Sequence, residues 1–264
     1  MKATVLLAIF ALLAISANGA STNSSPSLNP FDYLNVADIA KKYIAAFKRI
    51  MPCGFAPWNL PPLAPYTVDH YAYNLTGDDY SLTGSFSNVY IEGLNDWIVL
   101  DLSYNTTTEL LNFDVLYRNI QVLAEYTLNA SVSIAGFPIN YDGEGVVNWE
   151  YVDLRTVGSY KLETTSSNGL EMTNFNLQVL LGDIHNSDWN NYWNNDVNNF
   201  VNRFQREYGL LWIQQYQTYI SDMYSEYVLP LLNSQIGNLS MTEFLETLVG
   251  LTMQLEEMPC TPSQ

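Results

Sequence analysis

The sequence predicts an α+β fold: a long, strongly curved antiparallel β-sheet wrapped around one very long C-terminal helix, with a short N-terminal helix. Two patterns indicate this. Apolar and polar residues alternate between residues 66 and 181, which is the period of a strand with one buried face. Before this region, and again for about forty residues after it, apolar residues recur every three or four positions, as they do in an amphipathic helix.

The first twenty residues have the composition of a secretory signal peptide. Lys2 provides a positive charge, residues 5–15 form an apolar run, and small residues follow up to Ala20. Such a run is shorter than the roughly 20 apolar residues that cross a bilayer, so we expect cleavage. We also find no later segment long and apolar enough to span a membrane. We therefore expect a secreted, extracellular protein without stable membrane insertion.

Residues 21–30 are polar and contain prolines, which predicts a flexible tail, and we expect residues 31–264 to form a single domain. An amphipathic helix is predicted from about Phe31, because apolar residues then repeat at helical steps as far as Ile50. Pro52 and Gly54 end it. The segment from Pro52 to Tyr66 holds five prolines, which excludes helix and central strand.

The alternating region predicts eight to ten strands of about ten residues, joined by turns at residues 76–79, 93–96, 142–145 and 167–169. Little helix separates them, so the sheet is antiparallel. Ordinary strands have about five or six residues, and longer strands twist and curve strongly. We therefore expect the sheet to wrap around another element.

The long helix is predicted from Trp189 to Tyr227, with a bend at Gly209 and its end at Pro230. Gln205 is placed on its surface. A last helix is predicted from Met241 to Glu257, which returns the C-terminus to the body of the protein.

Two cysteines, Cys53 and Cys260, follow the signal peptide. In an oxidising compartment an even pair most simply forms one disulfide. The alternative is two unrelated free thiols.

Charge and motifs exclude several classes of function. The formal net charge of −17 makes nucleic acid an improbable partner. The sequence contains none of the common catalytic or nucleotide-binding motifs. His70 fits a strand residue, His185 fits the region that caps the long helix, and their spacing does not suggest a metal. We therefore expect no enzyme activity, no metal and no cofactor.

Three segments carry a resemblance to a known family. They are PPLAPY (61–66), GSFSNVYIEGLND (84–96) and LLGDIHNSDWNNYW (180–193). With the order of predicted elements, they resemble the insect haemolymph juvenile-hormone-binding, takeout and group 7 mite-allergen proteins of the tubular lipid-binding (TULIP) superfamily. The resemblance implies a TULIP-like half-tube that encloses an apolar cavity for a lipid or terpenoid. Takeout-like proteins usually pair two neighbouring cysteines near the N-terminus, and Cys53 has no such neighbour, so the juvenile-hormone ligand is not carried over.

Two functions remain open. The first is a secreted carrier that holds a small apolar ligand (a fatty acid, terpenoid or other lipid) in an internal tunnel. The second is a secreted, non-enzymatic interaction or recognition protein whose cavity is filled or vestigial. The sequence leaves the ligand and the oligomeric state open. For a carrier, the inward-pointing candidate residues are Phe113, Val115, Tyr117, Val122, Phe175, Leu177 and Val179 on strands, and Trp193, Val197, Phe200, Phe204, Tyr208 and Trp212 on the helix.

Glycosylation gives the first testable prediction. Acceptor sequences occur at Asn23, Asn74, Asn105, Asn129 and Asn238. We expect Asn74, Asn105 and Asn238 to be modified, because each lies at a predicted turn or loop. Endoglycosidase treatment of the protein from its natural source should then increase its mobility on a gel. Unchanged mobility would contradict the prediction.

Overall fold

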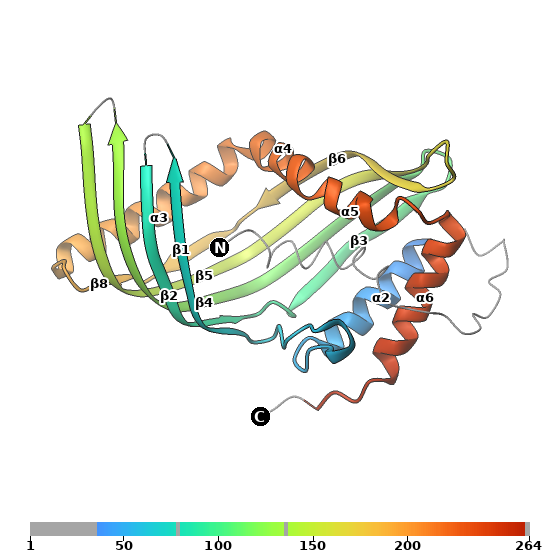
Figure 1. The fold of residues 1–264 in the computed structure, drawn as a ribbon, viewed down its shortest axis with the longest axis horizontal. Coiled ribbons are helices and arrows are strands. Elements are labelled where there is room, and N and C mark those ends of the chain that lie inside the picture. The colour runs from blue at the N-terminus through green and yellow to red at the C-terminus, as the bar shows by residue number, and fades with distance from the viewer. Residues whose placement is uncertain (1–35, 78–79, 135–136, 262–264) are drawn as a thin grey trace.

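The computed structural model describes residues 36–77, 80–134 and 137–261. The expected signal peptide, the tail and Asn23 lie outside the described residues. The strands form one eight-stranded antiparallel sheet in the order β1-β2-β4-β5-β6, with β3 paired to β4, and β7 and β8 paired to β5. Figure 1 shows that the long strands bend strongly at one end, and that helices run along one side of the sheet. The predicted curved antiparallel sheet is confirmed.

The sheet is built around a long hairpin of two strands. β4 (Leu110–Ile134) has 25 residues and β5 (Phe137–Thr164) has 28, and they pair along almost their whole lengths. The other strands are β1 (Tyr66–Gly77), β2 (Tyr80–Glu92), β3 (Trp97–Asn105), β6 (Leu170–Leu180), β7 (Asp183–Asn186) and β8 (Trp189–Asn190). The expected length of about ten residues fits β1, β2, β3 and β6, but it is wrong for the hairpin.

The turn predicted at residues 142–145 is wrong, because these residues lie inside β5. The glycines there serve close packing instead of a turn. A Cβ atom on Gly145 would lie 1.7 Å from the carbonyl oxygen of Trp189, and one on Gly143 would lie 2.6 Å from Asn190 Nδ2. Both neighbours belong to β8. Glycine within a strand marks such a close approach.

The C-terminal helical region is segmented. It comprises α3 (Asn195–Gln215), α4 (Gln217–Tyr227) and α5 (Leu229–Ile236), so the prediction of one unbroken helix from Trp189 is corrected. Gly209 lies inside α3, and the first break is at Tyr216. Pro230 does not end the helical region but stands in the first turn of α5, where its missing N–H is tolerated.

Polar side chains attach this helical region to the free edge of β6. At the first break, Gln217 accepts a hydrogen bond from Val179 N (2.8 Å) and donates to Val179 O (2.6 Å). Ser221 Oγ accepts from Leu177 N at 3.1 Å. Further along β6, the side chain of Asn233 accepts from Met172 N and donates to Met172 O in the same way. Unpaired backbone groups of an edge strand are thereby satisfied.

A pair of helices closes the other end of the molecule. Both were predicted: α2 (Val36–Ile50) and α6 (Met241–Glu257) have the expected bounds within the described residues, and they lie side by side in Figure 1. Ser240 and Glu243 form a capping box at the start of α6. At its end, Arg49 from α2 donates to the carbonyl oxygens of Leu255, Glu256 and Met258. A cation at this end also complements the helix dipole. A short 3₁₀ helix (Ala56–Trp58) follows α2.

The predicted disulfide Cys53–Cys260 is present, with a Cα–Cα distance of 5.7 Å. It covalently connects the ends of α2 and α6. We expect the double substitution Cys53→Ala/Cys260→Ala to lower the free energy of unfolding by about 2–5 kcal/mol, because the unfolded chain is no longer constrained. Urea denaturation of both proteins, without reductant, measures the difference. Equal midpoints, or two free thiols in non-reducing peptide maps of the wild type, would contradict this.

Candidate functional site

A cavity of about 400 Å³ lies between the sheet and the N-terminal part of α3. This volume is within the range of small-molecule sites. Its apolar wall includes Tyr73 on β1 and Phe86 on β2, with Trp193 and Val201 on the helical side. The remaining apolar lining residues are Val89, Val122, Ala124, Leu128, Val147, Trp149 and Tyr151.

Strand alternation builds the floor of the cavity. Every second residue of β4 from Val122 to Leu128 lines it, as does every second residue of β5 from Val147 to Tyr151. The two strands are in register there, with Ala124 opposite Val147. Tyr126 and Leu128 pair with glycines of β5. The missing side chains of these glycines leave room for β8, which pairs with β5 there. The same alternation, read from the sequence, had suggested only Val122 of this group as a candidate.

Part of the lining is polar, and we refer to this part as the polar end of the cavity. It contains Tyr126, Tyr141, Asp188 and Asn190, with Asn198, Asn202 and Gln205 from α3. Asn190 Nδ2 donates to the Tyr141 hydroxyl at 2.6 Å, and that hydroxyl lies 3.5 Å from the hydroxyl of Tyr126. Burial and the Tyr141 hydroxyl raise the pKa of Tyr126, so the Tyr126 phenol is neutral at physiological pH.

Asp188 is an acidic residue in this wall. Its carboxylate accepts hydrogen bonds from Trp149 Nε1 at 2.5 Å and from Asn148 N at 2.8 Å. Burial raises the pKa of this carboxyl, and these hydrogen bonds oppose the rise. Among the described residues that line the cavity, none is basic. The polar end therefore has an uncompensated acidic character.

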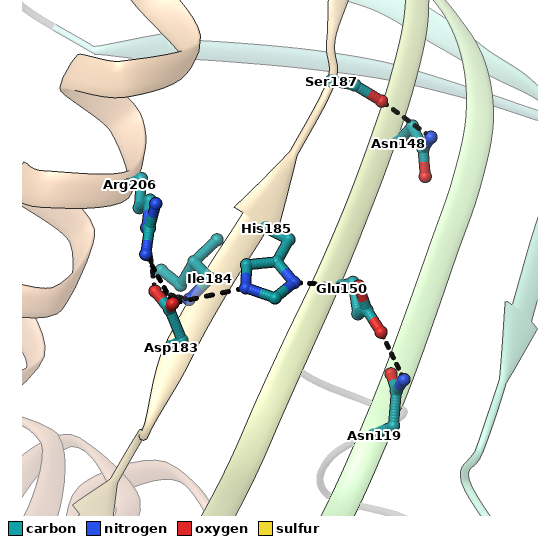
Figure 2. Close-up of polar contacts among 8 residues, drawn as sticks. All are labelled: Asn119, Asn148, Glu150, Asp183, Ile184, His185, Ser187 and Arg206. Atoms are coloured by element: carbon teal, nitrogen blue, oxygen red, sulfur yellow. Dashed lines mark hydrogen bonds and ion pairs between the residues drawn. The ribbon is translucent and has the colours of Figure 1, made fainter.

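A cluster of polar side chains connects α3 with the strands beside it (Figure 2). Arg206 on α3 forms two hydrogen bonds with Asp183 on β7, at 2.8 and 2.5 Å. His185 lies between Asp183 (3.2 Å) and Glu150 on β5 (3.1 Å), and Glu150 also accepts from Asn119 on β4. The hydrogen bonds from Arg206 hold the pKa of Asp183 below its usual range. The cluster connects β4, β5, β7 and α3.

The prediction that His185 caps the long helix is therefore wrong. It lies on β7, nine residues before Asn194, whose side chain caps α3 by accepting from Val197 N. Asn-rich segments favour such local hydrogen bonds over continued helix, which explains why α3 begins later than predicted. His70 does lie on a strand, as predicted, and is exposed beside Ser87.

The candidate strand residues other than Val122 lie outside the cavity wall. Phe113, Tyr117 and Leu177 are buried in the hydrophobic core, and the other three candidates pack partly buried against it. These three are Val115, Val179 and Phe175, whose ring stacks on Tyr224.

The candidate helix residues divide into two groups. Trp193 lines the cavity. Val197, Phe200, Phe204 and Tyr208 are exposed, with 39%, 58%, 54% and 54% of their surfaces accessible, and the rings of Phe204 and Tyr208 stack. Trp212 is half-buried and stacks on Tyr216. We refer to Val197, Phe200, Phe204 and Tyr208 as the aromatic row.

Sequence reasoning missed the polar side of α3. Asn198 and Asn202 are one turn apart and bond to the segment around β8: Asn190 N donates to Asn198 Oδ1 at 2.8 Å, and Asp188 N donates to Asn202 Oδ1 at 3.0 Å. Gln205, taken as a surface residue, lines the cavity and accepts from Asn186 Nδ2 at 2.8 Å. The available signal was the spacing of these amides on one face of the helix.

The chain is similar to one protein family and to two solved structures. Residues 5–246 match the family model described as haemolymph juvenile hormone binding protein, which confirms the resemblance. Takeout 1 of Epiphyas postvittana is a similar solved structure, with 13% identity, coverage of 81% of this chain and 91% of that chain, and a TM-score of 0.40. Lipopolysaccharide binding protein is another, with 12% identity, coverage of 75% of this chain and 40% of that chain, and a TM-score of 0.33. No curated protein matches the chain.

Within the described residues, no helix combines the length and apolarity needed to cross a bilayer. The family model covers most of the sequence. The chain belongs to the haemolymph juvenile hormone binding protein family.

Proposed function

We propose that this protein is a secreted, non-enzymatic carrier that holds a small apolar ligand in the cavity between the sheet and α3. The observation that carries the proposal is the composition of the wall: aliphatic and aromatic side chains surround about 400 Å³ of space, and a smaller set of polar groups forms the rest of the lining. This is the arrangement expected for a ligand with an apolar body and one polar group. Membership of a hormone-binding family supports the same conclusion.

Burial alone provides enough free energy for such binding. Hiding about 300 Å² of an acyl or isoprenoid chain, at about 25 cal/mol per Å², gives on the order of 7 kcal/mol. This corresponds to a Kd in the micromolar range before the entropy cost of ordering the ligand is subtracted. The candidates Val122 and Trp193 would contact the ligand directly, because both line the cavity.

The aromatic row extends this site along α3. Val201 lines the cavity, and Val197, Phe204 and Tyr208 are at the i−4, i+3 and i+7 positions, which share one side of a helix with it. A ligand longer than the cavity would therefore continue over these side chains.

The same row is the feature that favours the alternative function. Exposed aromatic side chains in a continuous row are also typical of protein interaction surfaces. In that case Phe200 and Phe204 would contact a partner protein, and the cavity would have no ligand. The two functions differ in whether the cavity itself binds an apolar probe.

A matched pair of substitutions on β5 tests the carrier function. Val147 lines the cavity, whereas its neighbour Val146 is 42% exposed and points to the opposite face. Val147→Asp should weaken binding of the neutral fluorophore N-phenyl-1-naphthylamine by about tenfold or more, because it places a charge against the apolar probe. Val146→Asp should leave the affinity unchanged.

Fluorescence titration of the three full-length proteins measures these affinities. Circular dichroism and thermal unfolding confirm that each variant is folded. Equal affinity in all three proteins would place the probe elsewhere. A wild-type protein that binds no apolar probe and yields no lipid on organic extraction would refute the carrier function and favour the interaction protein.

A further inference from the structure

The polar end of the cavity carries information about the head group of the ligand. Asp188 is held there by hydrogen bonds: its carboxylate accepts from Trp149, Asn148 and Gln205, and its backbone N–H and C=O bind the side chain of Asn202. The side chain is therefore fixed at the wall. A fixed carboxylate without a basic neighbour in the wall discriminates between ligands by their charge.

Resting on the proposed function, we propose that the cavity selects lipids with an uncharged, hydroxyl-bearing head group and rejects free carboxylic acids. Asp188 is the residue that determines this specificity. The described lining contains no lysine, arginine or histidine that could pair with a ligand carboxylate. The formal net charge of −17 adds to the disadvantage of an anion as it approaches.

Both partners that a hydroxyl group needs are present. A carboxylate offers about four acceptor sites, and the hydrogen bonds from Trp149, Asn148 and Gln205 occupy three sites on Asp188. Asp188 can thus accept a hydrogen bond from a ligand O–H. Asp188 and the two phenols line the same cavity, and the charge of Asp188 contributes to the raised pKa of Tyr126, after burial and the Tyr141 hydroxyl.

The phenols supply the donor. Tyr141 Oη already accepts from Asn190 Nδ2, and it lies 3.5 Å from the hydroxyl of Tyr126. Two hydroxyl groups hold two protons, but one hydrogen bond between them uses only one. The second O–H can therefore donate to the oxygen of the ligand. An alcohol satisfies Asp188 and this phenol together, whereas a carboxylate offers Asp188 no proton.

Repulsion between like charges sets the size of the discrimination. Two carboxylates about 5 Å apart, at an effective dielectric constant of about 20, repel strongly enough to weaken binding by on the order of 100-fold. The ligand can escape part of this penalty by binding in its protonated form. We therefore expect hexadecan-1-ol to bind about tenfold or more tightly than hexadecanoate at pH 7.5.

Competition against N-phenyl-1-naphthylamine measures both affinities on the full-length protein. Asp188→Asn should bring the ratio of the two Kd values close to one. The control is Glu125→Gln, which removes one negative charge on β4 between Ala124 and Tyr126. Glu125 is exposed, and strand alternation points it away from the cavity. This variant changes the net charge as much as Asp188→Asn does, but at a distance from the ligand. It should therefore keep the wild-type ratio of the two Kd values.

Three results would overturn the inference while leaving the carrier function intact. These are a wild type that binds hexadecanoate at least as well as hexadecan-1-ol, an unchanged ratio in Asp188→Asn, and an equal change in Glu125→Gln. Should Asp188→Asn fail to fold, the wild-type ratio and the variant Tyr141→Phe test the inference. Tyr141→Phe should weaken hexadecan-1-ol binding several-fold. If this variant binds hexadecan-1-ol as tightly as the wild type does, the proposed head-group site is overturned. If wild-type protein binds neither the fluorophore nor either lipid, the carrier function itself fails, and the specificity with it.

Discussion

The fold depends on how one edge of the sheet is satisfied. β6, β7 and β8 follow one another along β5, and among the described residues no further strand pairs with their outer backbone groups. Side chains of the helices provide those partners: Gln217 and Ser221 bind the backbone of β6, and Asn198 and Asn202 bind the segment around β8. The helices are thus fixed to the sheet by hydrogen bonds with defined geometry, in addition to apolar packing. This explains why a segment so rich in asparagine, a weak helix former, is helical here.

Fixing the amide side of α3 to the sheet edge determines where its other side points. Val201 reaches the cavity, while Arg206 turns towards Asp183 on β7. Asn198 and Asn202 hold α3 at the edge, and the cavity lies between α3 and the floor formed by β4 and β5. Its acidic polar end has the same origin, since Asp188 belongs to the short segment between β7 and β8 that α3 holds in place.

The sequence was most informative where one physical signal acted alone. The alternating pattern, the helical period of α2 and α6, and the pairing of Cys53 with Cys260 were predicted correctly. Two kinds of feature were missed. Gly143 and Gly145 suggested a turn, because a glycine needed for close approach has the same appearance in a sequence as one needed for a turn. Gln205 was placed on the surface, because the helical period does not show which distant segment a polar side chain contacts. Of the candidate site, the sequence therefore identified parts of the apolar wall but none of the polar end.

The disulfide has a consequence for the integrity of the molecule. It connects residues 207 positions apart, so that nearly all the described structure, from the end of α2 to the end of α6, forms a covalent ring. A protease that cuts one loop of this ring opens it into a line and does not divide it in two. The segments on either side of the cut stay covalently attached to one another, so they can pack together again without having to meet by diffusion. A single proteolytic cut within this ring would therefore leave the protein in one piece.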